Sequence, residues 1–175
     1  HTRLRADLIA ANQPVADLTT LWLDTDPDKW RLMRAGGVSE DYISGNRTPY
    51  EKFEKWAEIL PQAMRHPIYH QAHMELNRVF GIGETLKPSN ARDIYESCTA
   101  KLQTPEYLPQ AILRRLRIET LATTDDPADS LNAHLALRET GGVDALRIIP
   151  TWAPDRVLDL RHPEHYNLYL DQLAA

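Results

Sequence analysis

The most constraining feature of this sequence is a strand–helix–strand pattern toward its C-terminal end. Residues 118–124 and 145–150 are predicted strands, and between them Asp126-Pro127 begins a helix that Gly141-Gly142 closes. A pattern of about 30 residues with this order is typical of a βαβ unit with a right-handed crossover. Parallel strands are normally buried on both faces, and two are too few for a barrel. Either the chain's own helices cover the pair, or the pair is part of a longer chain, which is the simpler interpretation.

Residues 1–117 carry mainly helix signals. Asp26-Pro27 is an N-cap followed by proline at the first helical position, and Gly36-Gly37 provides the stop. Thr48-Pro49-Tyr50-Glu51 forms a capping box. Further helices are predicted from about Pro67, from about Ser89, from Pro105 to about Arg117, and from about Pro163 to Leu173. We therefore predict a mainly α chain with a helical domain at 1–117 and a βαβα segment at 118–175.

Composition limits the classes of function. With 42% hydrophobic residues the chain can bury a core, and its net charge of −5 gives no basic surface for nucleic acid. No apolar run approaches the roughly 20 residues of a membrane span, and no apolar signal core follows the basic N-terminus. The single cysteine, Cys98, excludes an internal disulfide and suits a reducing compartment. We expect a cytoplasmic protein without nucleic-acid or membrane partners.

Four segments, in order, resemble the front of the uronate (glucuronate) isomerases of the amidohydrolase superfamily. Order, spacing and residue types match over nearly the whole chain. The segments are Leu21-Trp22-Leu23 with Asp26 and residues 29–34; Tyr50-Glu51-Lys52-Phe53 with Trp56-Ala57; Pro67-Ile68-Tyr69-His70 with His73, Glu75-Leu76 and Phe80-Gly81-Ile82; and residues 123–131 followed by Pro150-Thr151-Trp152 and Pro154-Asp155.

The resemblance implies a fold and a reaction. The fold is a (β/α)8 barrel with a helical insertion after the first strand, of which this chain holds the insertion and an incomplete βαβ piece, strands two and three. The reaction is an aldose–ketose isomerisation that interconverts glucuronate with fructuronate, or galacturonate with tagaturonate. The implied partner is a hexuronate sugar. The implied cofactor is a divalent metal, generally zinc, on a His-x-His pair at the end of strand one.

The sequence departs from the family at three places. His1-Thr2-Arg3 keeps only the first histidine, and a guanidinium cannot ligate a metal, so His1 belongs to an incomplete metal site. Pro27-Asp28 replaces a His-Tyr pair, and Ala153 replaces the arginine expected to bind the substrate carboxylate. We therefore expect no activity from this chain alone. A fragment, a degenerate paralogue and an excised domain all fit.

Two other functions remain open. The first is a non-catalytic helical module selected for an interaction, which is favoured if the chain's own helices cover Ile118, Leu121, Leu146 and Ile148. If these residues face solvent or a second copy of the chain, the interpretation of the chain as a fragment of a barrel is favoured. A homo-oligomer would then be expected to cover the sheet. The second is a different amidohydrolase-type hydrolase, which the missing second histidine also disfavours.

Several residues are candidates for a site. Asp125, at the end of the first strand, is expected to face a pocket, whereas Asp126, with Pro127 and Asp129, suits a helix N-cap. Trp152, beyond the second strand, could contact a sugar. No residue is assigned a catalytic role.

The remaining constellations favour structural roles. His66, His70 and His73 share one helical face and form either a metal site or a hydrogen-bonded polar seam, which we favour. Cys98 is expected to be a core residue rather than a reactive thiol. We also expect core positions for Trp22, Trp30 and Trp56, and a solvated helix face for Arg114, Arg115 and Arg117.

Overall fold

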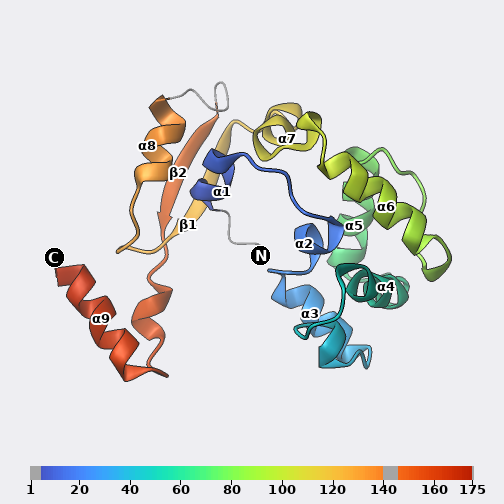
Figure 1. The fold of residues 1–175 in the computed structure, drawn as a ribbon, viewed down its shortest axis with the longest axis horizontal. Helices are drawn as coiled ribbons and strands as arrows, with labels where there is room; N and C mark the ends of the chain where they lie inside the picture. The colour runs from blue at the N-terminus through green and yellow to red at the C-terminus, as the bar shows by residue number, and fades with distance from the viewer. Residues whose placement is uncertain (1–4, 140–145, 175) are drawn as a thin grey trace. The chain divides into compact units, whose positions relative to one another are not determined.

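The computed structural model describes residues 5–139 and 146–174, and it divides by contacts into two compact units (Figure 1). One unit is Pro14–Leu108, and the other combines the described parts of residues 5–13 and 109–174. The boundary expected at residue 117 falls inside the second unit. Gln110 explains this, because its side chain donates to the Ile9 carbonyl at 3.0 Å and its backbone N–H donates to Asn12 Oδ1 at 3.0 Å.

Besides short 3₁₀ turns, the first unit contains five α-helices within the described residues. They are α2 (Leu18–Trp22), α3 (Pro27–Ala35), α4 (Pro49–Ile59), α5 (Pro67–Arg78) and α6 (Ala91–Leu102). The predicted caps are confirmed. Asp26 accepts from the amides of Asp28 and Lys29 at the start of α3. At α4, Thr48 and Glu51 exchange the reciprocal bonds of a capping box.

One apolar core holds this unit together. Trp22, Trp56 and Cys98 are buried in it, and half-buried Trp30 packs against it and donates its indole N–H to the Leu23 carbonyl. The core positions predicted for these residues are confirmed. Burial raises the pKa of the Cys98 thiol to about 12, so the thiol stays protonated at neutral pH.

Two of the three grouped histidines, His66 at the N-cap of α5 and His73 within it, are hydrogen-bonded to the backbone. His66 caps the helix, with Nδ1 accepting from the Ile68 amide at 3.2 Å. His73 Nδ1 donates to the Tyr69 carbonyl at 2.7 Å, while its Nε2 accepts from the Leu86 amide at 3.0 Å. The lone pairs that a metal would need on His66 and His73 are therefore engaged, which supports the polar-seam interpretation.

The helix predicted from Pro105 to Arg117 is wrong in its continuity. A single 3₁₀ turn, Pro105–Tyr107, is followed by the short α7 (Pro109–Arg115). Leu108 between them is extended, with ψ at 149°. The cause is Pro109, because a proline ring disfavours the helical conformation in the residue before it.

The second unit is built on a parallel pair of strands (Figure 1). They are β1 (Thr120–Asp125) and β2 (Arg147–Trp152), each displaced toward the C-terminus from the predicted range, with Leu121 opposite Ile148 and Asp125 opposite Trp152. Between them runs α8 (Asn132–Glu139), and after them α9 (Pro163–Ala174). The predicted βαβα order is confirmed, and the chain is mainly helical. The predicted closure of α8 at Gly141-Gly142 lies outside the described residues.

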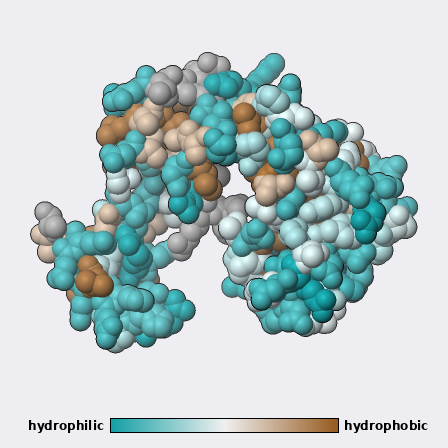
Figure 2. Space-filling view, viewed as in Figure 1, coloured by the Kyte–Doolittle hydropathy of each residue, from teal (hydrophilic) through white to brown (hydrophobic). Residues whose placement is uncertain are grey.

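Helices cover one face of this sheet. Leu121, Leu146 and Ile148 pack against Leu137 of α8 and against α1 (Ala6–Ala11). On the opposite face, Ala122 is exposed and Ile149 is 38% exposed. Figure 2 also shows apolar side chains at the surface over α8, where Leu135 is 52% exposed. The sheet is thus covered on one side only. Leu121, Leu146 and Ile148 are covered by the chain's own helices, which is the outcome that favours the interaction module, whereas the face that carries Ala122 and Ile149 is open.

None of the helices in the described ranges has both the length and the apolar character that crossing a membrane requires.

Candidate functional site

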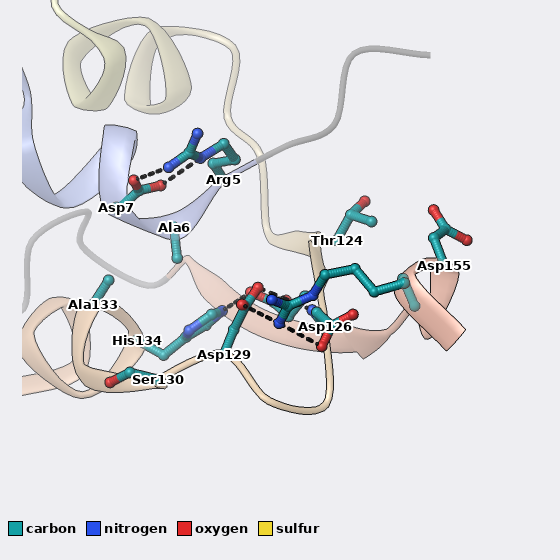
Figure 3. A pocket seen from close by; sticks show the side chains of 13 residues that line it. Arg5, Ala6, Asp7, Thr124, Asp126, Asp129, Ser130, Ala133, His134 and Asp155 are labelled. Atoms are coloured by element: carbon teal, nitrogen blue, oxygen red, sulfur yellow. Dashed lines mark hydrogen bonds and ion pairs between the residues drawn. The ribbon is translucent and has the colours of Figure 1, made fainter. Parts of the chain in front are cut away.

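A cavity of about 560 Å³ lies where β1 and β2 end, entirely within the second unit. Arg5 and Asp7 reach it from the start of α1, Asp126 and Asp129 from the loop after β1, and His134 from α8 (Figure 3). The segment that follows β2 completes the wall. The C-terminal edge of a parallel sheet is where α/β proteins place their ligand sites. This cavity is therefore the candidate site.

Asp125 is held at this edge by the strands themselves. Its Oδ2 accepts from the Thr123 hydroxyl at 2.7 Å and from the Thr151 amide at 3.3 Å. Its Oδ1 lies 3.6 Å from His134 Nε2, and the side chain is 15% exposed. Thr123 reaches it because residues two apart on a strand share a face. The structure therefore places Asp125 in the cavity wall, in a fixed orientation.

Asp126 points to different partners and does not cap α8 as predicted. Its Oδ1 accepts from the Ala128 amide at 3.0 Å, and its own amide donates to Asp129 Oδ2 at 3.1 Å. These bonds close a turn, and α8 begins later, at Asn132, where the Ser130 hydroxyl accepts from the Asn132 amide. Asp and Pro favour local turns as strongly as helix starts, which explains the error.

Arg156 connects the loop after β1 to the chain beyond β2. Its guanidinium donates to Asp126 at 2.8 Å and to Asp129 at 3.2 Å, and lies 4.6 Å from the centre of the Tyr169 ring of α9. The hydrogen bond that Arg156 donates lowers the pKa of Asp126, and the same hydrogen bond raises the pKa of Arg156. Asp126 is thus an ionised anchor of the wall rather than a proton-transfer group.

The charge of the cavity limits its ligands. Five aspartates line it against two arginines, Arg5 and Arg156. Arg5 is paired with Asp7, with Nε 3.0 Å from Oδ1 (Figure 3). Acceptor oxygens of this kind suit the hydroxyl groups of a polyol. A ligand carboxylate requires a further cation, which Ala153, also in the wall, does not supply.

The described residues do not provide a metal centre. Among residues 5–139 and 146–174, no three His, Cys, Asp or Glu side chains are grouped to hold a metal ion. The predicted ligand His1, and Arg3 two positions later in the sequence, lie outside the described residues. Since a guanidinium does not coordinate zinc, the donor set of this sequence does not fit the expected zinc site.

The other candidates from the sequence are not among the residues that line the cavity. Trp152 is 74% exposed and is not among the residues that line the cavity. Pro27 and Asp28 belong to α3 in the helical unit, where Asp28 pairs with Arg31 at 3.0 Å. Arg114, Arg115 and Arg117 are exposed, as predicted for a solvated surface.

Sequence reasoning missed Thr123, His134 and Arg156. Thr123 could have been predicted, because it lies two residues before Asp125 on a predicted strand and therefore shares a face with it. His134 and Arg156 reach the site only through the path of the loop after β1 and of the 3₁₀ turn Asp155–Leu158. No periodicity in the sequence marks those paths.

Comparison with known proteins agrees with this architecture. The glucuronate isomerase family profile matches residues 1–175. Uronate isomerases of Phocaeicola vulgatus and Solibacter usitatus are each 42% identical to the chain over its whole length, and the chain spans 37% of theirs. Crystal structures of uronate isomerase from Thermotoga maritima (37% identity) and glucuronate isomerase from Caulobacter crescentus (31%) superpose with TM-scores of 0.87, each covering 98% of this chain and 37% of the other. The chain belongs to the glucuronate isomerase family.

Proposed function

We propose that this chain forms the N-terminal part of a uronate isomerase and that the cavity at the ends of β1 and β2 is one side of its hexuronate site. The observation that carries this proposal is the fixed Asp125 carboxylate at the C-terminal edge of a parallel sheet, in a chain of this family. Relatives named as uronate isomerases support the substrate class.

In this proposal the two units have different places in a barrel enzyme. The helical unit is the insertion after the first barrel strand, and β1 and β2 are barrel strands two and three. The one-sided cover of the sheet supports this, because a barrel strand packs against helices on one face and against the barrel interior on the other. The exposed Ala122 and Ile149 lie on the face that the interior would bury.

The cavity supplies only part of what the reaction needs. Moving a proton between adjacent carbons of an aldose requires a base near the carbon acid and an electrophile on the carbonyl oxygen. A hexuronate also needs a cation for its carboxylate. Asp125 offers a positioned acceptor for a sugar hydroxyl, while Arg3 and Ala153 stand where the family is expected to have a metal ligand and a carboxylate-binding arginine. The zinc expectation remains a prediction.

An assay of the 175-residue chain with D-glucuronate, with and without added Zn²⁺, tests its competence. We expect no ketose above the rate without protein. Turnover that scales with protein concentration and survives repurification would contradict the proposal. A cytoplasmic location also remains a prediction, supported by the single protonated, buried thiol.

A further inference from the structure

The Thr123 hydroxyl lies between two other polar side chains at the end of β1. Its Oγ1 is 2.7 Å from Asp125 Oδ2 and 2.8 Å from His134 Nε2. Thr123 is 1% exposed, and the His134 and Asp125 side chains are 10% and 15% exposed. Buried polar groups form hydrogen bonds with the partners at hand, so the distribution of protons among these three groups decides the geometry.

The hydroxyl has one proton and two close neighbours. The Ile149 carbonyl is a third contact at 3.4 Å, too long to compete with a charged acceptor at 2.7 Å. The proton therefore points to Asp125 Oδ2, and the hydroxyl must accept from His134. If Nε2 lacked a proton, it would take the hydroxyl proton. Thr123 Oγ1 and Asp125 Oδ2 would then face each other at 2.7 Å with no hydrogen between them.

The other ring nitrogen leads to the same assignment. His134 Nδ1 is buried without a hydrogen-bond partner among the described residues. A proton on Nδ1 would be a buried donor without an acceptor, which costs about 1–3 kcal/mol. A bare lone pair there is the better-tolerated state. The contact of Nε2 with Thr123 and the lack of a partner for Nδ1 among the described residues thus both place the imidazole proton on Nε2.

We propose that His134 and Thr123 are positioning residues that orient Asp125 through a directed relay. His134 Nε2–H donates to Thr123 Oγ1, and the Thr123 hydroxyl donates to Asp125 Oδ2. Together with the Thr151 amide, this occupies Oδ2 and leaves Oδ1 without a hydrogen bond among the described residues. The carboxylate cannot rotate in the cavity wall without breaking the relay. Its use toward a hexuronate rests on the proposed function, whereas the relay itself does not.

Nitrogen-15 NMR of the histidine rings in the 175-residue chain tests the relay. The spectra are recorded at about pH 8.5, where an imidazole with the ordinary pKa of about 6.5 is neutral. We expect a single tautomer for His134, protonated on Nε2, with a proton that exchanges slowly with water. Protonation on Nδ1, or a ring averaged as in free imidazole, would overturn the proposal.

Three substitutions separate positioning from general packing. Thr123→Val keeps the shape and removes the hydroxyl, so exchange of the Nε2 proton is expected to accelerate about tenfold as the hydrogen bond is lost. Thr123→Ser restores the hydroxyl and should restore slow exchange. Thr124→Val is the matched control on the same strand and should leave His134 unchanged. Equal exchange in Thr123→Val and the unaltered chain would overturn the relay. No sugar enters these measurements, so their failure leaves the proposed function untouched.

Discussion

The ammonium of Lys29 lies 3.1 Å from Asp26 Oδ2, and the two side chains are only 6% and 13% exposed. The same ammonium donates to the Trp22 carbonyl at 3.0 Å. Asp26 meanwhile caps α3 by accepting from the Asp28 and Lys29 amides. The start of α3 is therefore fixed to the end of α2 by a buried charge pair whose hydrogen bonds also engage the backbone.

Lys29→Met should lower the free energy of unfolding by about 3 kcal/mol, because it leaves the Asp26 carboxylate buried without its countercharge. Urea denaturation followed by circular dichroism measures this loss. Arg31→Met is the matched control on the same helix, since Arg31 and Asp28 form an exposed pair that should contribute less than about 1 kcal/mol. Equal losses in both variants would contradict the buried-pair account.

The pH dependence of stability should reveal the same pair. Burial raises the pKa of Asp26, but Lys29 and the capping amides lower it more, so the net pKa falls below its usual range. A carboxyl whose pKa is lower in the folded state stabilises the fold above its unfolded pKa of about 3.9 and loses that contribution as pH falls through the folded pKa. Stability should therefore decline below about pH 4, and less steeply in Asp26→Asn. Identical slopes would exclude this role for Asp26.

Cys98 should be inert in the folded chain. Burial raises its thiol pKa to about 12, so almost no thiolate exists at neutral pH. Because the thiolate is the reactive species, modification by a thiol reagent at neutral pH should be about 100-fold slower than in the urea-denatured chain, or slower still. A rate of modification close to that of the denatured chain would place the thiol at the surface.

Thr48→Ala should destabilise the helical unit by about 1 kcal/mol by removing the cap of α4. The Thr48 side chain accepts from the Glu51 amide, while the Glu51 carboxylate accepts from the Thr48 amide at 2.9 Å. Thr48→Ser keeps the accepting oxygen and should remain within a few tenths of a kcal/mol of the unaltered chain. Denaturation midpoints of the three proteins compare them directly, and equal losses in the alanine and serine variants would argue against capping.

Local chemistry made much of the helical unit predictable. Asp26-Pro27 and the Thr48 box begin helices through contacts between residues close in sequence, and the apolar stripes behind them identified the core. The prediction of a continuous helix across Leu108 was wrong because it gave the apolar pattern more weight than the effect of Pro109 on the residue before it. In the structure the effect of Pro109 dominates, and Leu108 is extended. The prediction that Asp126 caps α8 was wrong because an Asp-Pro pair can begin a turn as well as a helix.

The site was less predictable because it depends on long-range geometry. Asp125 was found through its place at a strand end. His134 lies eleven residues after Thr123, and the two meet only because the loop after β1 forms its own turn before α8 begins. Arg156 reaches Asp126 across thirty residues. The sequence does not show that either pair of residues is close in space.

The most direct test of the account is isomerase activity in a chimera. This chain would replace the matching segment of the Thermotoga maritima uronate isomerase. D-Glucuronate turnover would be measured with the segment as it stands, with each departure restored alone (Arg3→His, the pair Pro27→His and Asp28→Tyr, or Ala153→Arg), and with all of them restored. We predict little turnover as it stands and a gain of at least about 100-fold when the expected metal ligand, the His-Tyr pair and the expected carboxylate-binding arginine are all restored. A folded, fully restored variant without turnover, or full turnover without any of these changes, would contradict the account.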